Sequence, residues 1–303
     1  MEHKKIYIVL ASVLAFACVV VTAVLVSVNR RNYIPYSAVE DMVELLSDAN
    51  IDISPSIIST KHQKGNVYIC GSDEYDSTVV RLLSDGDIRS VYGTPDGEII
   101  VLDDGSLFEF GGNFSFRYSA DGKKKELPDV RTLEDISGGM NDRERQKLEK
   151  TVTGFLEKGD KEFKLSGQIS VRIVVEKICQ YNGKTYVVCS RTIDGAEITD
   201  NTVVCTYEDG NVTDVEGVWC FFTEGKSYSA QLSDILSILF NIRKEITATP
   251  NDRAKIISVG MCYSLYYYGN GNKFCVIPCW QIKTESNGEF IFNALDSTLY
   301  TKR

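Results

Sequence analysis

Histidine is scarce in this chain. Of 303 residues only two are histidine, His3 and His62, the first in a short tail before an apolar run and the second in the polar stretch KHQKGN. Imidazole is the usual proton carrier near neutral pH and the commonest nitrogen ligand for metals. The sequence therefore supplies almost no material for histidine-based catalysis or for a His-rich metal site.

Other signatures of catalysis and metal binding are missing as well. The chain contains no G-x-S-x-G, no P-loop, no H-E-x-x-H and no C-x-x-C pair. Acidic turns such as Asp103-Asp104-Gly105 lack the ladder of an EF-hand calcium loop. We expect no catalytic residue, no cofactor and no metal site. A pair of carboxylates in a cleft stays open as an enzymatic alternative.

Positive charge is also in short supply. The net charge is −9. Residues 1–31 carry four basic residues against Glu2, a net +3, so the remainder carries −12. An acidic body of this kind repels phosphate backbones, which makes nucleic acid a poor partner.

A long apolar run, Ile6–Val28, has no charged residue over 23 positions. As a helix it would be about 34 Å long, enough to cross a hydrocarbon core of roughly 30 Å. A signal-peptidase site would follow the apolar run. The A-x-A pattern at Ala15 and Ala17 lies inside the run instead, which argues against cleavage. We expect a cytoplasmic tail at 1–5 and an uncleaved transmembrane helix at 6–28 in the bilayer. Basic residues flank both ends, so charge leaves the orientation open.

Small residues recur on one face of this expected helix, at Ala11, Ala15, Cys18 and Thr22. Such a stripe lets a second helix approach closely in lipid. The four residues are therefore candidates for partner binding. The alternative is that they are the scattered small residues common in membrane helices.

Helix and strand patterns follow the anchor. A capping box at Ser37 and Glu40 predicts a helix start, and Val39, Val43 and Leu46 lie on one apolar face. Turn residues then separate short apolar runs, which predict strands. These runs are NVYIC, STVVRLL, EIIVLDD, SLFEF and FSFRYS.

The second half of the chain has a helix-then-strands order that occurs twice. Asn141 caps a predicted helix, and X-Gly turns then separate four strands at about 168–178, 184–192, 197–207 and 211–222, an antiparallel meander. A helix at about 230–245 precedes three more strands at 255–268, 273–284 and 289–300. We expect an α+β fold with extramembrane domains at 29–130, 131–225 and 226–303.

Eight cysteines follow the apolar run, an even number that permits four disulfides. Most lie inside apolar strand runs, where cysteine behaves as a small buried hydrophobe. Cys275 and Cys279 are four residues apart on one expected strand, roughly 13 Å, which is too far to bridge. We predict mostly free, buried thiols.

Three stretches carry a resemblance to a known family. They are SAVEDMVELLSDANIDI after the anchor, AKIISVGMCYSLYY, and VIPCWQIKTESNGEFIFNAL near the end. They resemble the YycH/YycI family, and YycI more closely. In that family the helix after the anchor ends in N-x-I-D-I. The last strands of the family carry the motifs I-x-x-V-x-x-x-Y and P-x-W-x-I and end in N-A. The matching positions are Ile257, Val259, Tyr263, Pro278, Trp280, Ile282, Phe290, Phe292, Asn293 and Ala294. The match covers both ends well and the middle only by element order. Asp296-Ser297 departs from the Thr-Gly type turn that often follows the N-A.

The resemblance implies two PepSY-like α+β units outside the cell, on a single-pass helix of the cell membrane with a cytoplasmic N-terminus. It implies a regulator, not an enzyme, that associates with a membrane sensor histidine kinase of a Gram-positive two-component system controlling cell-wall metabolism. A related YycH-like protein is a second expected partner, and no small-molecule ligand is expected. The closing hairpin with Trp280 would be a structural and docking element. Core packing is the alternative role of Trp280.

A second hypothesis belongs to a different class. The chain would be an extracytoplasmic PepSY-type inhibitor or ligand-binding module that acts on a wall hydrolase or protease. What separates it from the kinase regulator is a concave surface lined with aromatic side chains and deep enough for a ligand.

Overall fold

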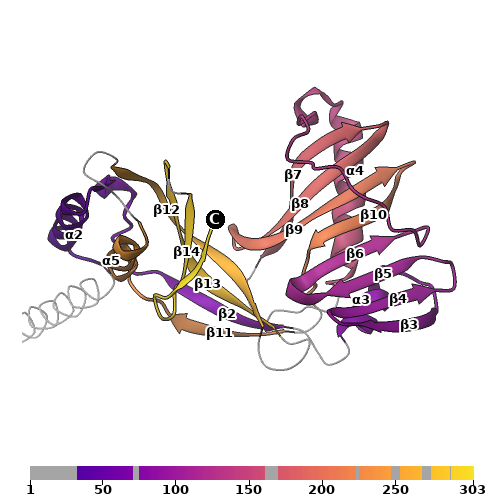
Figure 1. Ribbon diagram of the computed structural model, residues 1–303, viewed down its shortest axis with the longest axis horizontal. Coiled ribbons are helices and arrows are strands. Elements are labelled where there is room, and N and C mark those ends of the chain that lie inside the picture. Colours follow the sequence, from indigo (N-terminus) through magenta and orange to yellow (C-terminus); the bar gives the residue numbers. More distant parts are fainter. Residues whose placement is uncertain are drawn as a thin grey trace, which may run out of the picture. The chain divides into compact units, whose positions relative to one another are not determined.

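The computed structural model describes residues 33–70, 75–160, 170–222, 225–246, 253–267, 274–286 and 288–303. These residues form two compact units, neither of which is one continuous segment (Figure 1). The described part of unit 1 falls in 33–65, 231–260 and 280–303, and unit 2 takes 66–230 and 261–279. Strands β12 (Ala254–Tyr267) and β13 (Phe274–Thr284) have residues in both units.

Unit 1 contains segments from both the N-terminal and the C-terminal part of the chain. Besides parts of β12 and β13, its elements are α2 (Tyr36–Asp48), β1 (Ile51–Ile53), η1 (Pro55–Ile57), α5 (Ile235–Glu245), β14 (Glu289–Asn293) and β15 (Leu299–Lys302). Strand β1 pairs in parallel with β12, with Ile51 opposite Ala254. Helix α2 contacts α5, and the apolar residues of both helices are buried, among them Leu46 and Leu239. Burial of these stripes drives the two helices together.

Unit 2 holds most of the strands. Its elements begin with β2 (Lys64–Cys70), whose first two residues belong to unit 1, and end with β11 (Gly225–Gln231), whose last residue belongs to unit 1. Between them lie α3 (Tyr75–Leu83), β3 (Ile88–Thr94), β4 (Gly97–Leu102), β5 (Leu107–Gly111), η2 (Gly112–Phe114), β6 (Ser115–Ser119), η3 (Ser137–Gly139), α4 (Asp142–Lys158), β7 (Val171–Tyr181), β8 (Lys184–Ile193), β9 (Ala196–Glu208) and β10 (Asn211–Val218). Strand β10 pairs with both β9 and β6, and β6, β5, β4 and β3 then follow as antiparallel neighbours.

The meander β7–β10 confirms the sequence prediction. Its turns have φ of +50° at Asn182, Asp194 and Asp209, each followed by a glycine with φ near +80°. Asparagine, aspartate and glycine tolerate this left-handed region better than other residues, which is why these pairs make tight hairpins.

Helix α4 covers this sheet. The side chain of Asn141 accepts a hydrogen bond from the Arg143 N–H, so the predicted cap is confirmed. Leu148, Val152 and Leu156 are buried and join the core formed by the strands. Figure 1 shows α4 along the face of β8, β9 and β10, and it contacts β7, β9 and β10.

The expected fold class, an α+β chain of PepSY-like units behind a transmembrane helix, is wrong. The described residues are mainly mixed β-sheet, in which antiparallel pairs dominate and β12 forms parallel pairs with β1 and β9. Parallel pairs between strands far apart in sequence leave no local signal, so turn and periodicity patterns could not reveal them. No helix in the described ranges is long and apolar enough to cross a membrane, and Ile6–Val28 lies outside those ranges.

Local predictions fail at several places. The stretch STVVRLL, predicted as a strand, lies in α3, and its Val79, Val80 and Leu83 are buried. The capping box at Ser37 is not formed, since α2 begins at Tyr36 after Pro35 and has no side-chain cap. The first residues predicted for the helix at 230–245 instead end β11, and Asp234 caps α5 by accepting from Ser237 N–H.

The cysteine and hairpin predictions fare better. All eight cysteines from Cys70 to Cys279 are free and buried, which confirms the prediction. Strand β14 pairs with β13, and Gly288 has φ +83° at their junction. Asn287 itself lies outside the described residues.

Candidate ligand-binding pocket

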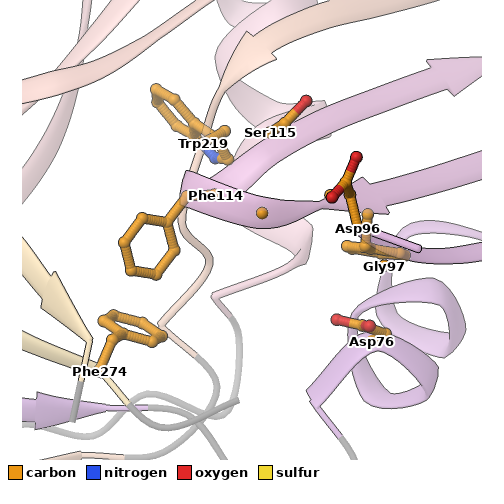
Figure 2. Close-up of a pocket in the computed structure, with 10 residues that line it drawn as sticks. Asp76, Asp96, Gly97, Phe114, Ser115, Trp219 and Phe274 are labelled. Atoms are coloured by element: carbon orange, nitrogen blue, oxygen red, sulfur yellow. The ribbon is translucent and has the colours of Figure 1, made fainter. Parts of the chain in front are cut away.

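A cavity of about 130 Å³ opens in unit 2 beside β4, β5 and β6 (Figure 2). Every residue that lines it belongs to this unit. The lining residues are Asp76, Asp96, Gly97, Phe110, Gly111, Gly112, Phe114, Ser115, Trp219 and Phe274. Its volume is close to that of engineered cavities of about 150 Å³ that bind benzene. The space therefore suits a molecule with one ring.

Aromatic side chains form one side of the cavity. The rings of Phe114 and Phe274 meet edge to face, with centroids 5.2 Å apart. Phe274 starts β13 and lies opposite Cys70 of β2. The Trp219 backbone N–H donates to Phe114 O at 2.9 Å, so the residue after β10 is attached to the loop before β6. Three distant segments thus place three aromatic rings at one site.

The backbone beside the cavity is strained. Asn113 and Phe114 have φ of +55° and +60°. Asparagine tolerates this left-handed region, but a bulky residue such as phenylalanine rarely adopts it, at a cost of about 1–3 kcal/mol. The conformation lets the Phe114 side chain point at Phe274, as Figure 2 shows. Such strain persists where the surrounding contacts impose it.

Trp219, which lines the cavity, carries a buried hydrogen-bond donor. The residue is 2% exposed, and its Nε1 has no hydrogen-bond partner among the described residues. Figure 2 shows the indole nitrogen on the edge of the ring nearer to Phe114. A desolvated N–H without an acceptor costs roughly 1–3 kcal/mol. An acceptor placed in the cavity would remove this cost.

Behind the indole lies a buried ion pair. Arg191 is fully buried, and its guanidinium carbon is 4.3 Å from the Trp219 ring centroid and 4.6 Å from that of Phe222. Its Nη1 donates to Cys220 O at 2.5 Å and its Nη2 to Asp160 Oδ2 at 2.7 Å. Stacking on two rings and two hydrogen bonds fix the guanidinium, which in turn holds the indole plane.

Asp160 completes this support. Its Oδ1 accepts from the Phe222 N–H at 2.7 Å while Oδ2 accepts from Arg191. Burial raises the pKa of Asp160 to about 6, although the charge of Arg191 and the Phe222 N–H act in the opposite direction. Through these hydrogen bonds, Asp160 and Arg191 connect the C-terminal end of α4 to the segment Trp219–Phe222.

Two carboxylates lie on the other side of the cavity. Asp76 comes from α3 and Asp96 from the turn between β3 and β4, and Figure 2 shows both across from Phe114 and Phe274. Burial raises the pKa of Asp76 to about 6, and the negative charge of Glu98 adds to the increase. Neither carboxylate forms an ion pair within the part of the chain that the structure describes, and no described lining residue is basic. This side of the cavity is thus acidic.

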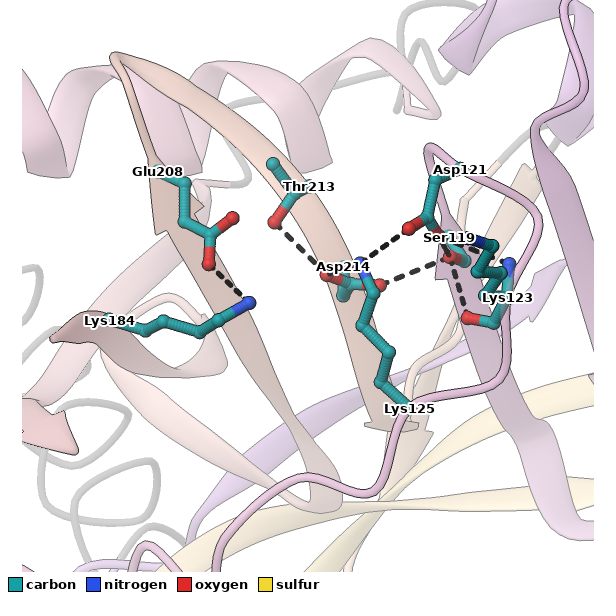
Figure 3. A network of polar contacts seen from close by, with 8 residues as sticks. All are labelled: Ser119, Asp121, Lys123, Lys125, Lys184, Glu208, Thr213 and Asp214. Carbon is teal, nitrogen blue, oxygen red and sulfur yellow. Dashed lines mark hydrogen bonds and ion pairs between the residues drawn. The ribbon is translucent and has the colours of Figure 1, made fainter. Parts of the chain in front are cut away.

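A polar cluster elsewhere in unit 2 is already satisfied by its own members (Figure 3). Lys125 Nζ lies 3.2 Å from Asp214 Oδ2 and 3.1 Å from Asp121 Oδ2, and Thr213 Oγ1 donates to Asp214 at 3.0 Å. Lys125 therefore attaches the loop after β6 to β10. The cluster has a structural role.

Unit 1 contains a larger hollow of about 450 Å³ between α2, β1 and β12. Its lining is mainly aliphatic, with Ile51, Ile53 and Ile257 among the residues, and includes the charged residues Asp52 and Lys255. Asp52 pairs with Arg253 at 3.1 Å, and Lys255 pairs with Glu285 at 3.4 Å. Because its charges are paired and its walls lack aromatic residues, it offers less to a small ligand than the pocket of unit 2.

Of the predicted site residues the structure describes only Trp280, which does not line this pocket. Ala11, Ala15, Cys18 and Thr22 lie outside the described residues. Trp280 is 3% exposed in unit 1, and its Nε1 donates to Ser233 O at 3.1 Å. It packs in the core, the alternative role named above, and its role toward a partner stays a prediction.

Sequence patterns missed every residue of the pocket. The available signal was the stretch FEFGGNFSF at 108–116, in which Gly-Gly-Asn interrupts two aromatic strand runs. An interruption of that kind brings aromatic residues to a turn. The contributions of Asp76, Trp219 and Phe274 depend on long-range pairing and had no signal.

Comparisons with known proteins add little to this site. No family model matches the chain, and no curated protein matches it. Among solved structures, it is similar to an uncharacterized protein from Eubacterium rectale, with a TM-score of 0.42 and 11% identity over 84% of this chain and 89% of the other. The function has to be argued from the residues of the pocket.

Proposed function

We propose that this chain is a non-enzymatic regulatory protein that binds a small organic molecule in the pocket of unit 2. The observation that carries the proposal is the desolvated Trp219 N–H beside a cavity of about 130 Å³. A ligand that offers an acceptor would satisfy this donor while it buries apolar surface against Phe114 and Phe274. Both effects favour binding.

The arrangement of the acidic residues supports binding better than catalysis. Acid–base cleavage by two carboxylates needs the scissile bond between them. Here Asp76 and Asp96 lie on the same side of the cavity, and the aromatic rings occupy the other (Figure 2). The concave aromatic surface is the feature named above as typical of a ligand-binding module. Ligand binding is therefore part of this proposal, whereas the family resemblance implied no small-molecule ligand.

We propose further that the protein is anchored in the cell membrane by Ile6–Val28, with its N-terminus cytoplasmic, and associates with a sensor histidine kinase and a YycH-like protein. The resemblance at the two chain ends supports this proposal. Those ends are neighbours in unit 1, where β1 pairs in parallel with β12 and β14 pairs with β13.

Ligand binding is tested by thermal unfolding of the full chain in detergent with a library of single-ring fragments. Binding to the native state raises stability by about 2.7 kcal/mol at a hundredfold excess over Kd. A Cβ on Gly112, which lines the pocket, would meet no atom closer than 3.8 Å, so Gly112→Leu fills the space without a backbone clash. We expect some fragments to raise the Tm of the wild type but not of Gly112→Leu.

The matched control is Gly138→Leu, since a Cβ there meets nothing within 4 Å and Gly138 does not line the pocket. This variant should respond to fragments as the wild type does. If no fragment stabilises the wild type, or if all three proteins respond alike, the pocket does not bind ligands and the proposal fails.

Kinase association is tested by substitution in the small-residue stripe. Ala15→Ile keeps the segment apolar, so insertion should survive, but it would separate closely packed helices. We expect loss of co-purification with the kinase at unchanged protein level and membrane localisation. Val20→Leu, on another face, should change little. If both variants associate normally, the stripe does not bind the partner.

A further inference from the structure

The charges around the pocket discriminate between ligands. Two carboxylates face the cavity, and none of its described lining residues carries a positive charge. An anionic ligand would meet like charges without a compensating cation, whereas a cationic group would gain an ion pair with the partly buried Asp76 and a second with the exposed Asp96. The charge of the walls therefore selects against acids.

The aromatic side of the pocket points in the same direction. Phe114 and Phe274 present ring surface to the cavity, with Trp219 next to them (Figure 2). Ring faces attract cations and also bury flat apolar groups. Arg191 shows that this environment accepts a cation, because its guanidinium already stacks on Trp219 and Phe222.

Trp219 sets a second polar requirement. The residue is 2% exposed, and its buried Nε1 has no acceptor in the described chain. An indole nitrogen donates only, so the partner must be an acceptor such as a hydroxyl, ether or carbonyl oxygen. A ligand that combines one acceptor with one cation would match both polar parts of the pocket.

Size restricts the ligand further. A cavity of about 130 Å³ holds one ring with small substituents. We infer that the pocket binds a compact single-ring organic ammonium ion that also carries a hydrogen-bond acceptor. The ammonium lies by Asp76 and Asp96, the ring contacts Phe114 and Phe274, and the acceptor receives the Trp219 N–H. This inference rests on the proposed function, because it names the ligand class of the same pocket.

Four probes of similar size separate the contributions. They are 4-hydroxybenzylamine, which has both polar groups, benzylamine, which lacks the acceptor, p-cresol, which lacks the ammonium, and 4-hydroxybenzoate, which is anionic. Their affinities for the full chain in detergent are measured at neutral pH by calorimetric titration. We expect 4-hydroxybenzylamine to bind about tenfold more tightly than benzylamine or p-cresol, and 4-hydroxybenzoate to show no saturable binding.

Variants identify the groups responsible. Asp76→Asn and Asp96→Asn keep the shape of the side chain and remove its charge. Together they should lower the affinity for 4-hydroxybenzylamine about tenfold and leave that for p-cresol within about twofold. Trp219→Phe should remove the preference for 4-hydroxybenzylamine over benzylamine, because only that preference needs the N–H.

The outcomes separate this inference from the proposed function. Equal or tighter binding of p-cresol or 4-hydroxybenzoate relative to 4-hydroxybenzylamine overturns the ligand class and leaves ligand binding in place. An ammonium preference that survives in the doubly substituted Asp76→Asn/Asp96→Asn protein also overturns it. If none of the four probes binds and no library fragment stabilises the chain, the inference and the proposed function both fail.

Discussion

Arg191 holds its guanidinium carbon 4.3 Å from the ring centroid of Trp219, the residue that supplies a donor to the pocket. The same guanidinium donates to Asp160 at 2.7 Å. The orientation of the indole thus depends on an ion pair outside the cavity. Arg191 is a positioning residue, and its effect can be measured separately from that of the lining residues.

Removing Arg191 should destabilise the fold strongly. Arg191→Met leaves the Asp160 carboxylate without its counter-charge, and breaking a buried pair in this way costs about 3–5 kcal/mol. The Asp160 side chain keeps 17% exposure, so we expect the lower end of that range. Urea unfolding of the full chain measures the loss.

The control for this prediction is Asp160→Asn/Arg191→Met. Removing both charges leaves no unpaired ion, so the double variant should be more stable than Arg191→Met alone. A double variant that is less stable than Arg191→Met, or an Arg191→Met protein as stable as the wild type, would show that the pair is not coupled as described.

Two glycines of the α4 region should respond oppositely to alanine. A Cβ on Gly159 would lie 2.2 Å from Cδ1 of the buried Phe221 ring, so Gly159→Ala should destabilise by about 1–3 kcal/mol through overpacking. A Cβ on Gly154 meets nothing within 4 Å, so Gly154→Ala should stabilise by about 0.8–1 kcal/mol through helix propensity. Chemical denaturation of both variants tests this, and effects of equal sign would contradict it.

Asp76 and Asp121 should have opposite effects on the pH dependence of stability. The pKa of Asp76 is raised from 3.8 to about 6, so the folded state binds its proton more tightly, and ionisation lowers stability as the pH rises from about 4 to about 6. Asp76→Asn should therefore be more stable than the wild type at pH 7 and no more stable at pH 4.

For Asp121 the sign is reversed. The Lys123 N–H, with smaller contributions from Lys125 and Ser119, lowers the pKa of this carboxyl from 3.8 to about 2. Its stabilisation is present above the ordinary pKa and is lost as the pH falls toward 2. Asp121→Asn should be slightly less stable than the wild type at pH 7 and equally stable near pH 2. Urea unfolding across the pH range tests both, and two variants that shift in the same direction would refute these assignments.

The described cysteines should all be reduced and protected. Eight are free and buried, so native protein should react slowly with a thiol reagent while denatured protein without reductant should expose eight thiols besides Cys18. Fewer than eight reactive thiols after denaturation would indicate disulfides that the structure does not contain.

Local patterns in the sequence predicted those elements whose geometry is decided locally. The meander β7–β10 was predictable because Asn182-Gly183, Asp194-Gly195 and Asp209-Gly210 specify their turns. The strand prediction for STVVRLL failed because its threonine and valines favour strands, whereas burial of Val79, Val80 and Leu83 on one face makes it a helix. Strand β3 was missed because its residues are mostly exposed and lack an apolar alternation.

The pocket was out of reach for a different reason. Asp76, Asp96, Phe114, Trp219 and Phe274 are separated by many residues, and β10–β6 and β13–β2 pairing brings their segments together. Neither pairing is between consecutive strands. The left-handed φ of Phe114 also contradicts the preference of phenylalanine, so no propensity could indicate it.

Ligand binding in the pocket can be measured at the Trp219 indole itself. The chain has two tryptophans, so full-length protein labelled with ¹⁵N-tryptophan should give two indole N–H resonances, and Trp280→Phe assigns them. We expect 4-hydroxybenzylamine to shift the Trp219 resonance saturably and to have no effect on it in Gly112→Leu. The resonance of Trp280, whose Nε1 donates to Ser233 O, should stay unchanged. A Trp219 resonance that none of the four probes moves, or a shift that persists in Gly112→Leu, would contradict ligand binding in this pocket.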